Sequence, residues 1–387
     1  MKKTLHYMLT GATGLLGRNL LFEIIKQHLD DLTRIKIFVL GRAGLAQRIF
    51  EIIGTDGMNY LSLDKGEQKG LLDALGAVIH CLHFDLESYI GADEQWLQQQ
   101  GVDFFFHVAA HTDFRSSEAV KKKLWSVNVD GTHKVLDLAR RIRVAHFIYT
   151  GSAYACGDTT GRIEPDYINF DQSFRNPYEL SKLEAEVSVR RFTRRHGIKA
   201  TFFRPSTICG RLIEKEIGAV SKFDVFYAWM FFFLRCKERM YKENDLDKTA
   251  FMPCRVAYNP ESGLNIVPAD YAAKAMYRLT LHPTGTDSFH LVNTGETKHD
   301  CYIPAMTTAI GMEGMQHVAE PPLMELNELE TMYYKTVGAI FTPYITSAPM
   351  EFAVPGAGEP TAPAVDAGNF DKLLAYALDN RHGVTKN

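Results

Sequence analysis

The chain has 387 residues, enough for about two to three domains or for one large α/β domain with a second lobe. Its residues are 46% hydrophobic and 23% charged, and the mean hydropathy is −0.15, values that exclude a disordered, collagen-like or coiled-coil chain. The formal net charge of −3 gives no bulk electrostatic argument for a nucleic-acid partner.

The cysteines and the apolar segments indicate a compartment. Six scattered cysteines with no C-x-x-C pair predict reduced thiols in a cytoplasmic protein and no metal site. Two lysines precede an apolar run at the N-terminus, as in a signal peptide, but Gly11, Gly14 and Gly17 interrupt that run. The apolar stretch 225–234 is about half the length that a bilayer requires.

The first 210 residues alternate between short apolar runs and helical patterns. This rhythm predicts an α/β fold, a Rossmann-type doubly wound parallel sheet with strands buried on both faces. We assign residues 1–210 to the domain built on this sheet, to which 265–295 return. We assign 211–264 and 296–387 to a smaller, mostly helical substrate lobe, with a loop at 347–368 and a last helix at Phe370–Leu378. The predicted strands are Leu5–Leu9, Ile35–Leu40, Ala77–Leu82, Asp103–Val108, Ala145–Thr150, Ala200–Arg204 and Phe289–Val292.

A glycine-rich turn follows the first strand and opens the first helix. The segment TGATGLLG places glycines at 11, 14 and 17, where they permit a tight turn and a close approach of the backbone to a pyrophosphate. The spacing G-x-x-G-x-x-G differs from the G-x-G-x-x-G of two-site dehydrogenases. The turn predicts a dinucleotide site.

Two arginines follow the second strand. An acidic residue there would hold a ribose 2′-hydroxyl, whereas Arg42 and Arg48 can pair with a 2′-phosphate. Asp30 and Asp31 precede the strand and would lie at its wrong end. The sequence therefore predicts NADP rather than NAD, and residues 1–210, with 265–295, are predicted to form the NADP-binding domain.

Candidate catalytic groups follow the later strands. Tyr178 and Lys182 form Y-x-x-x-K after Pro177, a helix start, so both side chains lie on one helix face. A nearby ammonium favours a phenolate, which could exchange a proton with a substrate oxygen. Ser152 lies just past the end of the fifth strand, where its hydroxyl can polarise the carbonyl group that contains the same substrate oxygen.

The fourth strand ends in small residues and two histidines. Ala109 and Ala110 would let a cofactor lie close to the sheet. His107 and His111 are candidate general bases, although local hydrogen bonding is their commoner role.

These motifs together resemble the extended short-chain dehydrogenase/reductase superfamily. TGATGLLG, HVAA, NVDGT at 128–132 and Y-x-x-x-K occur in its usual order, and YTGSAYACG, NPYELSKLEAE, FRPSTICGR and NIVPADYAAKAM resemble its thioester-reducing branch, which includes fatty acyl-CoA reductases. The resemblance covers about residues 4–295. It implies catalysis by Ser152, Tyr178 and Lys182. The cofactor residues that it implies are Gly11, Thr13, Gly14, Leu15, Gly17, Asp85, Leu86, Asn128, Lys182, Pro205, Ser206 and Thr207.

The chain departs from the branch at two places. Gly151 stands where the branch often has serine, and the segment after Gly210 lacks a full match. The second departure concerns the substrate more than the chemistry.

An aromatic-rich segment, 223–234, has two interpretations. It is either core of the small lobe, or an acyl-chain groove or membrane-facing patch. Basic clusters at 121–123, 140–143 and 190–195 are either solvated helix faces or docking sites for an acidic acyl-carrier protein or a coenzyme A phosphate.

The leading prediction is an NADPH-dependent reductase of a fatty acyl thioester, carried by coenzyme A or an acyl-carrier protein, which yields an aldehyde and, with a second hydride, an alcohol. The alternatives are a 3β-hydroxysteroid-type dehydrogenase, a nucleotide-sugar epimerase or dehydratase, and a cofactor-binding protein without catalysis. The prediction includes no nucleic-acid partner and leaves a peripheral membrane contact and the oligomeric state open.

Overall fold

The computed structural model describes residues 4–88, 94–241, 248–282, 285–354 and 361–381. Parts of the predicted lobe, of the returning segment 265–295 and of the predicted loop 347–368 lie outside these residues. Within the described part of the chain, no helix combines the length and the apolar character that crossing a bilayer requires.

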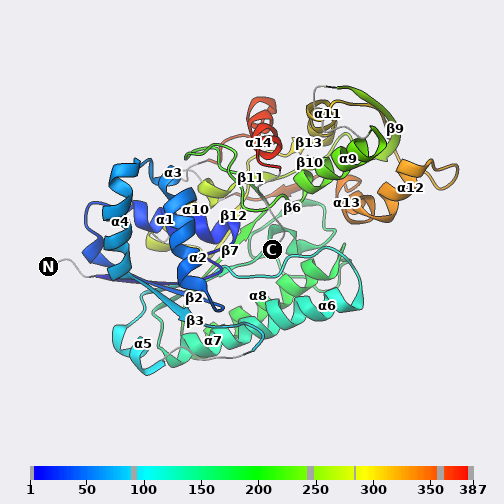
Figure 1. The fold of residues 1–387 in the computed structure, drawn as a ribbon. Coiled ribbons are helices and arrows are strands. Elements are labelled where there is room, and N and C mark those ends of the chain that lie inside the picture. Colours follow the sequence, from blue (N-terminus) through cyan, green and yellow to red (C-terminus); the bar gives the residue numbers. More distant parts are fainter. Residues whose placement is uncertain (1–3, 89–93, 242–247, 283–284, 355–360, 382–387) are drawn as a thin grey trace.

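A parallel sheet lies between two layers of helices (Figure 1). In the described chain it has seven strands in the order β12-β7-β5-β4-β1-β2-β3. Beginning at β1, the chain adds strands first toward one edge of the sheet (β2, β3) and then toward the other (β4, β5, β7, β12). This is the Rossmann-type doubly wound sheet that the apolar runs predicted. The strands are β1 (Leu5–Thr10), β2 (Ile35–Gly41), β3 (Ile79–His83), β4 (Phe104–His107), β5 (His146–Thr150), β7 (Lys199–Pro205) and β12 (Ser288–Leu291).

The strands are almost wholly apolar because helices cover both faces of the sheet. Tyr7 and Leu9 pack into one core cluster, whereas Met8 between them packs into the opposite one. Figure 1 shows the two helical layers. One layer contains α1 (Leu15–Lys26), α2 (Leu45–Ile52), α3 (Met58–Leu61), α4 (Lys65–Val78) and α10 (Ala269–Leu281). The other contains α5 (Glu94–Gln100), α6 (Glu118–Leu124), α7 (Gly131–Arg141) and α8 (Pro177–His196).

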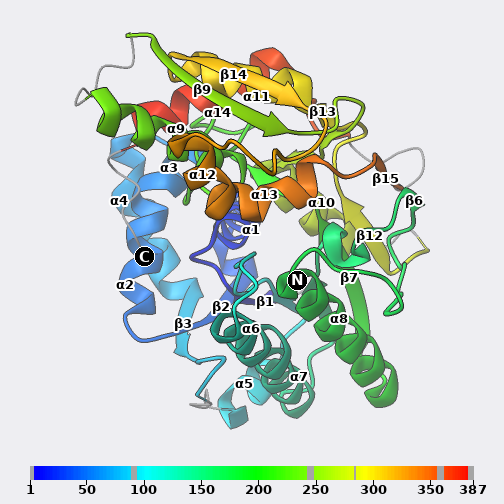
Figure 2. The same cartoon turned by 90° about the vertical axis from the view of Figure 1, so that its right-hand side faces the viewer.

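A second lobe covers the carboxyl ends of the strands (Figure 2). Its helices surround a separate hydrophobic core, and its longest strands, β9 and β14, pair in parallel. The helices are α9 (Phe226–Tyr241), α11 (His299–Ala309), α12 (Glu328–Lys335), α13 (Val337–Ile345) and α14 (Ala367–Asp379). The further strands are β6 (Gly161–Ile163), β8 (Thr207–Cys209), β9 (Ala250–Ala257), β10 (Gly263–Leu264), β11 (Ile266–Pro268), β13 (Thr297–Lys298), β14 (Met312–Val318) and β15 (Met350–Phe352).

The predicted loop at 347–368 is partly wrong. Residues 350–352 form β15, which pairs in parallel with β6 in register Met350↔Gly161. The partner strand lies nearly 190 positions earlier in the chain, so the local composition of Ala, Pro and Gly could not indicate the pairing. β15 joins the lobe to the loop between β5 and α8.

Candidate active site

One cavity of about 740 Å³ lies between the carboxyl ends of the central strands and the lobe. The glycine turn, the ends of β2, β4, β5 and β7, and the first turn of α8 line one side, and α9, α11 and α13 line the other. The crevice beside β1, where the strand order reverses, is the ligand position typical of open α/β sheets. Of the predicted catalytic and cofactor-binding residues, all except Asn128 line this cavity.

The glycine turn has the geometry of an anion-binding loop. Gly11 has a φ of +75°, and a Cβ there would lie 2.6 Å from the Ala109 backbone nitrogen. A Cβ on Gly17 would lie 2.1 Å from the Gly11 carbonyl oxygen. Helix α1 begins after Gly14 with no side-chain cap and no acidic residue in its first turn, so its N-terminal dipole faces the cavity uncompensated. These residues fit a dinucleotide pyrophosphate.

Arg42 and Arg48 are exposed side chains at the far end of the cavity, beyond β2. Asp85 lies near Arg42. Hydrogen bonds from the Glu87 N–H (3.0 Å) and from Ser88, together with the Arg42 charge, lower the pKa of Asp85. The end of the cavity therefore combines two cations with a carboxylate, where the ribose and adenine of a dinucleotide would lie.

The structure brings Ser152, Tyr178 and Lys182 together. Ser152 and Lys182 are buried, 5% and 3% exposed. Tyr178 hydrogen bonds to Ser152 and Thr112. The Lys182 Nζ donates to the Thr150 carbonyl at 2.7 Å and lies 4.9 Å from the centroid of the Tyr149 ring. Helix α8 positions two of the three groups, because Asn176 caps it and Pro177 is its first residue.

The protonation of Tyr178 differs from the sequence-based expectation. Burial raises the pKa of Tyr178 to about 12, despite the opposing hydrogen bonds to Thr112 and Ser152. Burial also lowers the pKa of Lys182 to about 8, against the attraction of Glu186. The expectation of a phenolate favoured by Lys182 is therefore wrong for this structure, because removal from water outweighs the hydrogen bonds that lower the pKa of Tyr178. A neutral phenol is suited to donating a proton.

The two histidines have different surroundings. His107 is buried between Thr10 (2.8 Å from Nδ1) and Thr132 (3.0 Å from Nε2), and burial lowers its pKa to about 3. It makes the local hydrogen bonds that are the commoner role of such a residue. His111 lines the cavity, and burial lowers its pKa.

Asn128 bonds to residues around the site without lining the cavity. Its Oδ1 accepts from the His111 N–H at 2.7 Å, and its Nδ2 donates to the His111 carbonyl and to Ser181 Oγ. All of its polar side-chain atoms are therefore committed to protein partners. The predicted cofactor contact of Asn128 is not supported, because the side chain ties the loop after β4 to α8 instead of facing the cavity.

Gly151 has a packing explanation. A Cβ at this position would lie 2.8 Å from Glu186 Oε2. That carboxylate makes two hydrogen bonds of 2.8 and 2.9 Å with Arg204, and neither side chain is exposed. A serine here would have to displace a buried ion pair.

Sequence reasoning missed several residues of the cavity wall. Thr112 and Phe114 follow the HVAA segment in the chain, and this closeness to a recognised motif could have indicated that they line the cavity. Tyr344 lies on α13, far along the chain in a segment with no chemical motif. Other missed residues of the lobe wall include Ser221, Lys222, Leu264, Tyr302, Ile303, Met306, Phe341 and Ile345.

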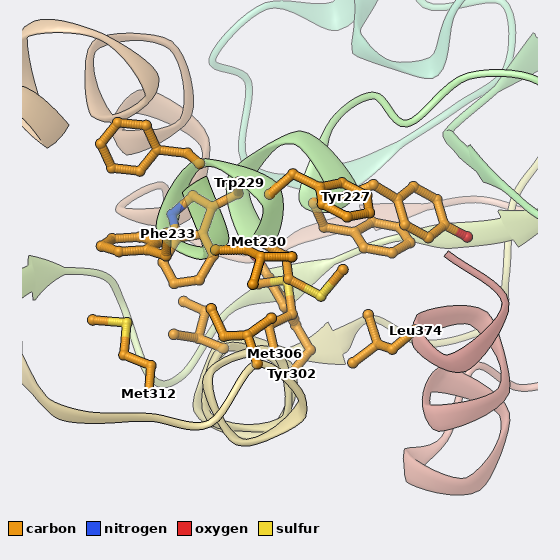
Figure 3. Close-up of a cluster of buried hydrophobic side chains, with 14 of the residues drawn as sticks. Tyr227, Trp229, Met230, Phe233, Tyr302, Met306, Met312 and Leu374 are labelled. Carbon is orange, nitrogen blue, oxygen red and sulfur yellow. The ribbon is translucent and has the colours of Figure 1, made fainter. Parts of the chain in front are cut away.

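The aromatic segment contributes to both the core and the cavity. Figure 3 shows Trp229, Met230 and Phe233 of α9 facing Tyr302 and Met306 of α11 inside the lobe. The Trp229 Nε1 donates to the Tyr333 hydroxyl at 3.2 Å. Phe226, Tyr227 and Trp229 also line the cavity. The membrane-facing interpretation of this segment is wrong, because its aromatic side chains are buried or half-buried.

The basic clusters differ in how exposed their side chains are and in which ion pairs they make. Arg190 is committed to Glu186 (2.8 Å) and stacks 3.8 Å from the centroid of the Phe202 ring. Lys121, Lys122 and Lys123 on α6 are exposed, and Lys123 pairs with Glu87 at the cavity wall.

Comparison with known proteins identifies the family. A family model described as male sterility protein matches residues 9–276, more than half of the chain. The chain belongs to this family, within the extended short-chain dehydrogenase/reductases. The match confirms the resemblance inferred from the motifs and assigns an NAD(P)-binding domain to the chain.

The curated relatives are longer proteins, and this chain matches only a part of each. A linear gramicidin synthase of Brevibacillus parabrevis is 25% identical over 323 residues, which cover 77% of this chain and 5% of that protein. The 3beta-hydroxysteroid-dehydrogenase/decarboxylase isoform 2 of Arabidopsis thaliana is 28% identical over 229 residues, covering 56% of this chain and 35% of that protein. The chain therefore spans only a fraction of the length of these relatives.

Solved structures confirm the fold. The terminal R domain from the myxalamid PKS-NRPS biosynthetic pathway has a TM-score of 0.70 at 21% identity, covering 100% of this chain and 93% of that one. A thiolation-reductase di-domain from an archaeal non-ribosomal peptide synthetase has a TM-score of 0.63 at 18% identity, covering 98% and 91%.

Proposed function

We propose that the protein uses NADPH to reduce a fatty acyl thioester, carried by coenzyme A or an acyl-carrier protein, to an aldehyde, which a second hydride from another NADPH can convert to an alcohol. The observation that carries this proposal is the continuity of the cavity. The same cavity is lined by Ser152 and Tyr178 and by the apolar side chains of Phe226, Trp229, Ile303, Met306 and Phe341. An acyl chain is the substrate part that such a wall would bind. The R-domain and thiolation-reductase neighbours are consistent with a thioester.

The residues would divide the chemistry as follows. When bound, NADPH supplies the hydride that reduces the carbonyl carbon. Ser152 and Tyr178 hold the carbonyl oxygen, and the neutral phenol of Tyr178 donates its proton to it, which yields a hemithioacetal. Collapse of this species breaks the carbon–sulfur bond, and the hydroxyl proton leaves with the thiol. The Lys182 ammonium stabilises the tyrosinate and is held by the Thr150 carbonyl.

We assign the choice of NADPH to Arg42 and Arg48. Both side chains are exposed at the end of the cavity, where a 2′-phosphate would find no carboxylate from the end of β2. Arginine binds phosphate with two parallel hydrogen bonds.

The proposal is tested with purified protein, NADPH and a mixed pool of acyl-coenzyme A and acyl-carrier thioesters, with products identified by mass spectrometry. We expect NADPH oxidation with release of aldehyde or alcohol. Tyr178→Phe should reduce kcat more than about 100-fold while retaining NADPH binding. Binding of NADPH without turnover of any thioester by the wild-type protein would refute the proposal.

A 3β-hydroxysteroid-type dehydrogenase is the second candidate, because curated relatives carry that name and an apolar wall would also suit a steroid. Incubation with NAD⁺ and a 3β-hydroxysteroid distinguishes the two, since formation of NADH and a ketone would favour the dehydrogenase. The apolar wall is less suited to a nucleotide sugar.

A further inference from the structure

The strongest unassigned feature is a hydrogen-bonded connection between the lobe and the first turn of the catalytic helix. Tyr344 on α13 lines the cavity. Its hydroxyl donates to Glu179 Oε1 at 2.8 Å and accepts from Asn176 Nδ2 at 2.6 Å. Asn176 and Glu179 flank Tyr178 in the chain, and both are buried, 5% and 0% exposed.

Both partners of Tyr344 control the start of α8. Asn176 is the N-cap, because its Oδ1 accepts from the Glu179 N–H at 3.2 Å. The Glu179 carboxylate accepts from the Arg175 N–H at 3.0 Å and pairs with the Arg175 guanidinium at 3.3 Å. The Tyr344 hydroxyl thus fixes which way the Asn176 amide points and where the Glu179 carboxylate lies.

The ring of Tyr344 reaches the same centre by a second route. Phe114 stands edge-on to Tyr178, with 5.2 Å between ring centroids, and edge-on to Tyr344 at 6.0 Å. The Arg175 guanidinium lies 5.2 Å from the Tyr344 ring centroid. Tyr344 therefore contacts three groups that restrain Tyr178 from the lobe side of the cavity: the cap, the carboxylate and the Phe114 ring.

We propose that Tyr344 is a positioning residue, which holds the first turn of α8 in place from the lobe and thereby sets the orientation of Tyr178. On this proposal, the Tyr178 hydroxyl has the orientation needed for proton donation only while α13 packs over the cavity. The kinetic part of this inference rests on the proposed reductase function, whereas the structural part does not.

The test uses Tyr344→Phe, which keeps the ring and removes the hydroxyl. Tyr334→Phe is a matched control, because Tyr334 is another lobe tyrosine whose hydroxyl bridges backbone groups, accepting from the Ala257 N–H at 3.2 Å and donating to the Arg255 carbonyl at 3.0 Å. Hydrogen–deuterium exchange of the backbone amides across 176–182 measures how readily the first turn of α8 opens, and it requires no substrate. We expect exchange to rise at least fivefold in Tyr344→Phe and to stay unchanged in Tyr334→Phe.

Steady-state kinetics provide the second readout. Tyr344→Phe should lower kcat about tenfold and leave the KM for NADPH within twofold, because the glycine turn and Arg42 lie on the opposite side of the cavity. In a Glu179→Gln background the same substitution should cause a smaller further loss, since the two groups act through one contact. A solely structural role would lower the melting temperature and leave kcat of the folded protein unchanged.

The outcomes separate the two proposals. Faster exchange across 176–182 in a protein that reduces no thioester supports the coupling and refutes the proposed reaction. Thioester reduction with unchanged kcat and unchanged exchange in Tyr344→Phe refutes the coupling and supports the reaction. Independent, additive losses in the Tyr344→Phe and Glu179→Gln variants would also overturn the coupling.

Discussion

At the scale of single residues, burial determines the protonation of the candidate catalytic groups. Lys182 and Tyr178 are removed from water by α8 and the loop after β5, which moves the pKa of the lysine down to about 8 and that of the tyrosine up to about 12. Near neutral pH the site therefore combines a cationic ammonium with a neutral phenol. These are the states that the proposed reduction of a carbonyl would use.

The first prediction concerns pH. A lysine with a lowered pKa is charged below about pH 8 and loses its charge above it, so kcat/KM for thioester reduction should fall as the pH rises through about 8. Lys182→Arg keeps the charge at all accessible pH values and should remove this decline in whatever activity it retains. The exposed Lys199→Arg variant is the control. A flat profile up to pH 10 in the wild-type protein would contradict the role of Lys182.

The second prediction concerns the glycine turn. A Cβ on Gly17 would overlap the Gly11 carbonyl, so Gly17→Ala should lower the free energy of unfolding by at least about 2 kcal/mol and weaken dinucleotide binding. Gly76→Ala on α4 meets nothing within 4 Å and should be neutral or slightly stabilising. Chemical denaturation of both variants measures the difference, and equal stabilities would contradict the steric argument.

At the scale of elements, α9 contributes to both the lobe core and the cavity wall, because apolar side chains occupy more than one face of the helix. Phe233 and Met230 are wholly buried among α11 and α12 side chains, while Phe226 and Trp229 also reach the cavity. The interpretation of this segment as core of the lobe therefore describes part of it, and the acyl-chain groove stays a prediction for the residues that line the cavity. The segment stabilises the lobe and shapes the cavity wall.

The third prediction separates these tasks. Phe233→Ala leaves a void in the lobe core and should lower the free energy of unfolding by about 3–5 kcal/mol. Met240→Ala, at the exposed end of the same helix, should change it by less than about 0.5 kcal/mol. Denaturant titration of the two variants is the measurement. A small effect of Phe233→Ala would show that the lobe core is loosely packed.

At the scale of the whole molecule, the cavity exists only because the lobe closes over the carboxyl ends of the strands. Its lining comes from chain segments between residue 10 and residue 345. A dinucleotide bound there would contact the glycine turn, the arginines after β2 and the catalytic helix at once. Such a ligand should stabilise the native state as a unit.

The fourth prediction follows from this linkage. NADPH at 100 times its Kd should add about 2.7 kcal/mol to the free energy of unfolding and raise the melting temperature. Arg42→Ala should weaken NADPH binding about tenfold or more and leave NADH binding unchanged, because only NADPH carries the 2′-phosphate. Arg195→Ala, exposed at the end of α8, is the matched control. Equal losses for both dinucleotides would remove the case for NADP.

The sequence by itself determined the sheet, the glycine turn and the identity of the catalytic candidates. Buried parallel strands need continuous apolar runs, and a pyrophosphate loop needs glycines at particular positions, so both leave local patterns in the chain. The family follows from the same motifs, which lie within residues 9–276.

Only the tertiary structure decided the rest, because the remaining features depend on contacts between distant segments. The pairing of β15 with β6, the commitment of Asn128 to the loop after β4, and the position of Tyr344 beside α8 each join residues with no shared local pattern. The protonation of Tyr178 belongs to the same group, since desolvation is a property of the assembled cavity and exceeds the influence of any single neighbour in the chain.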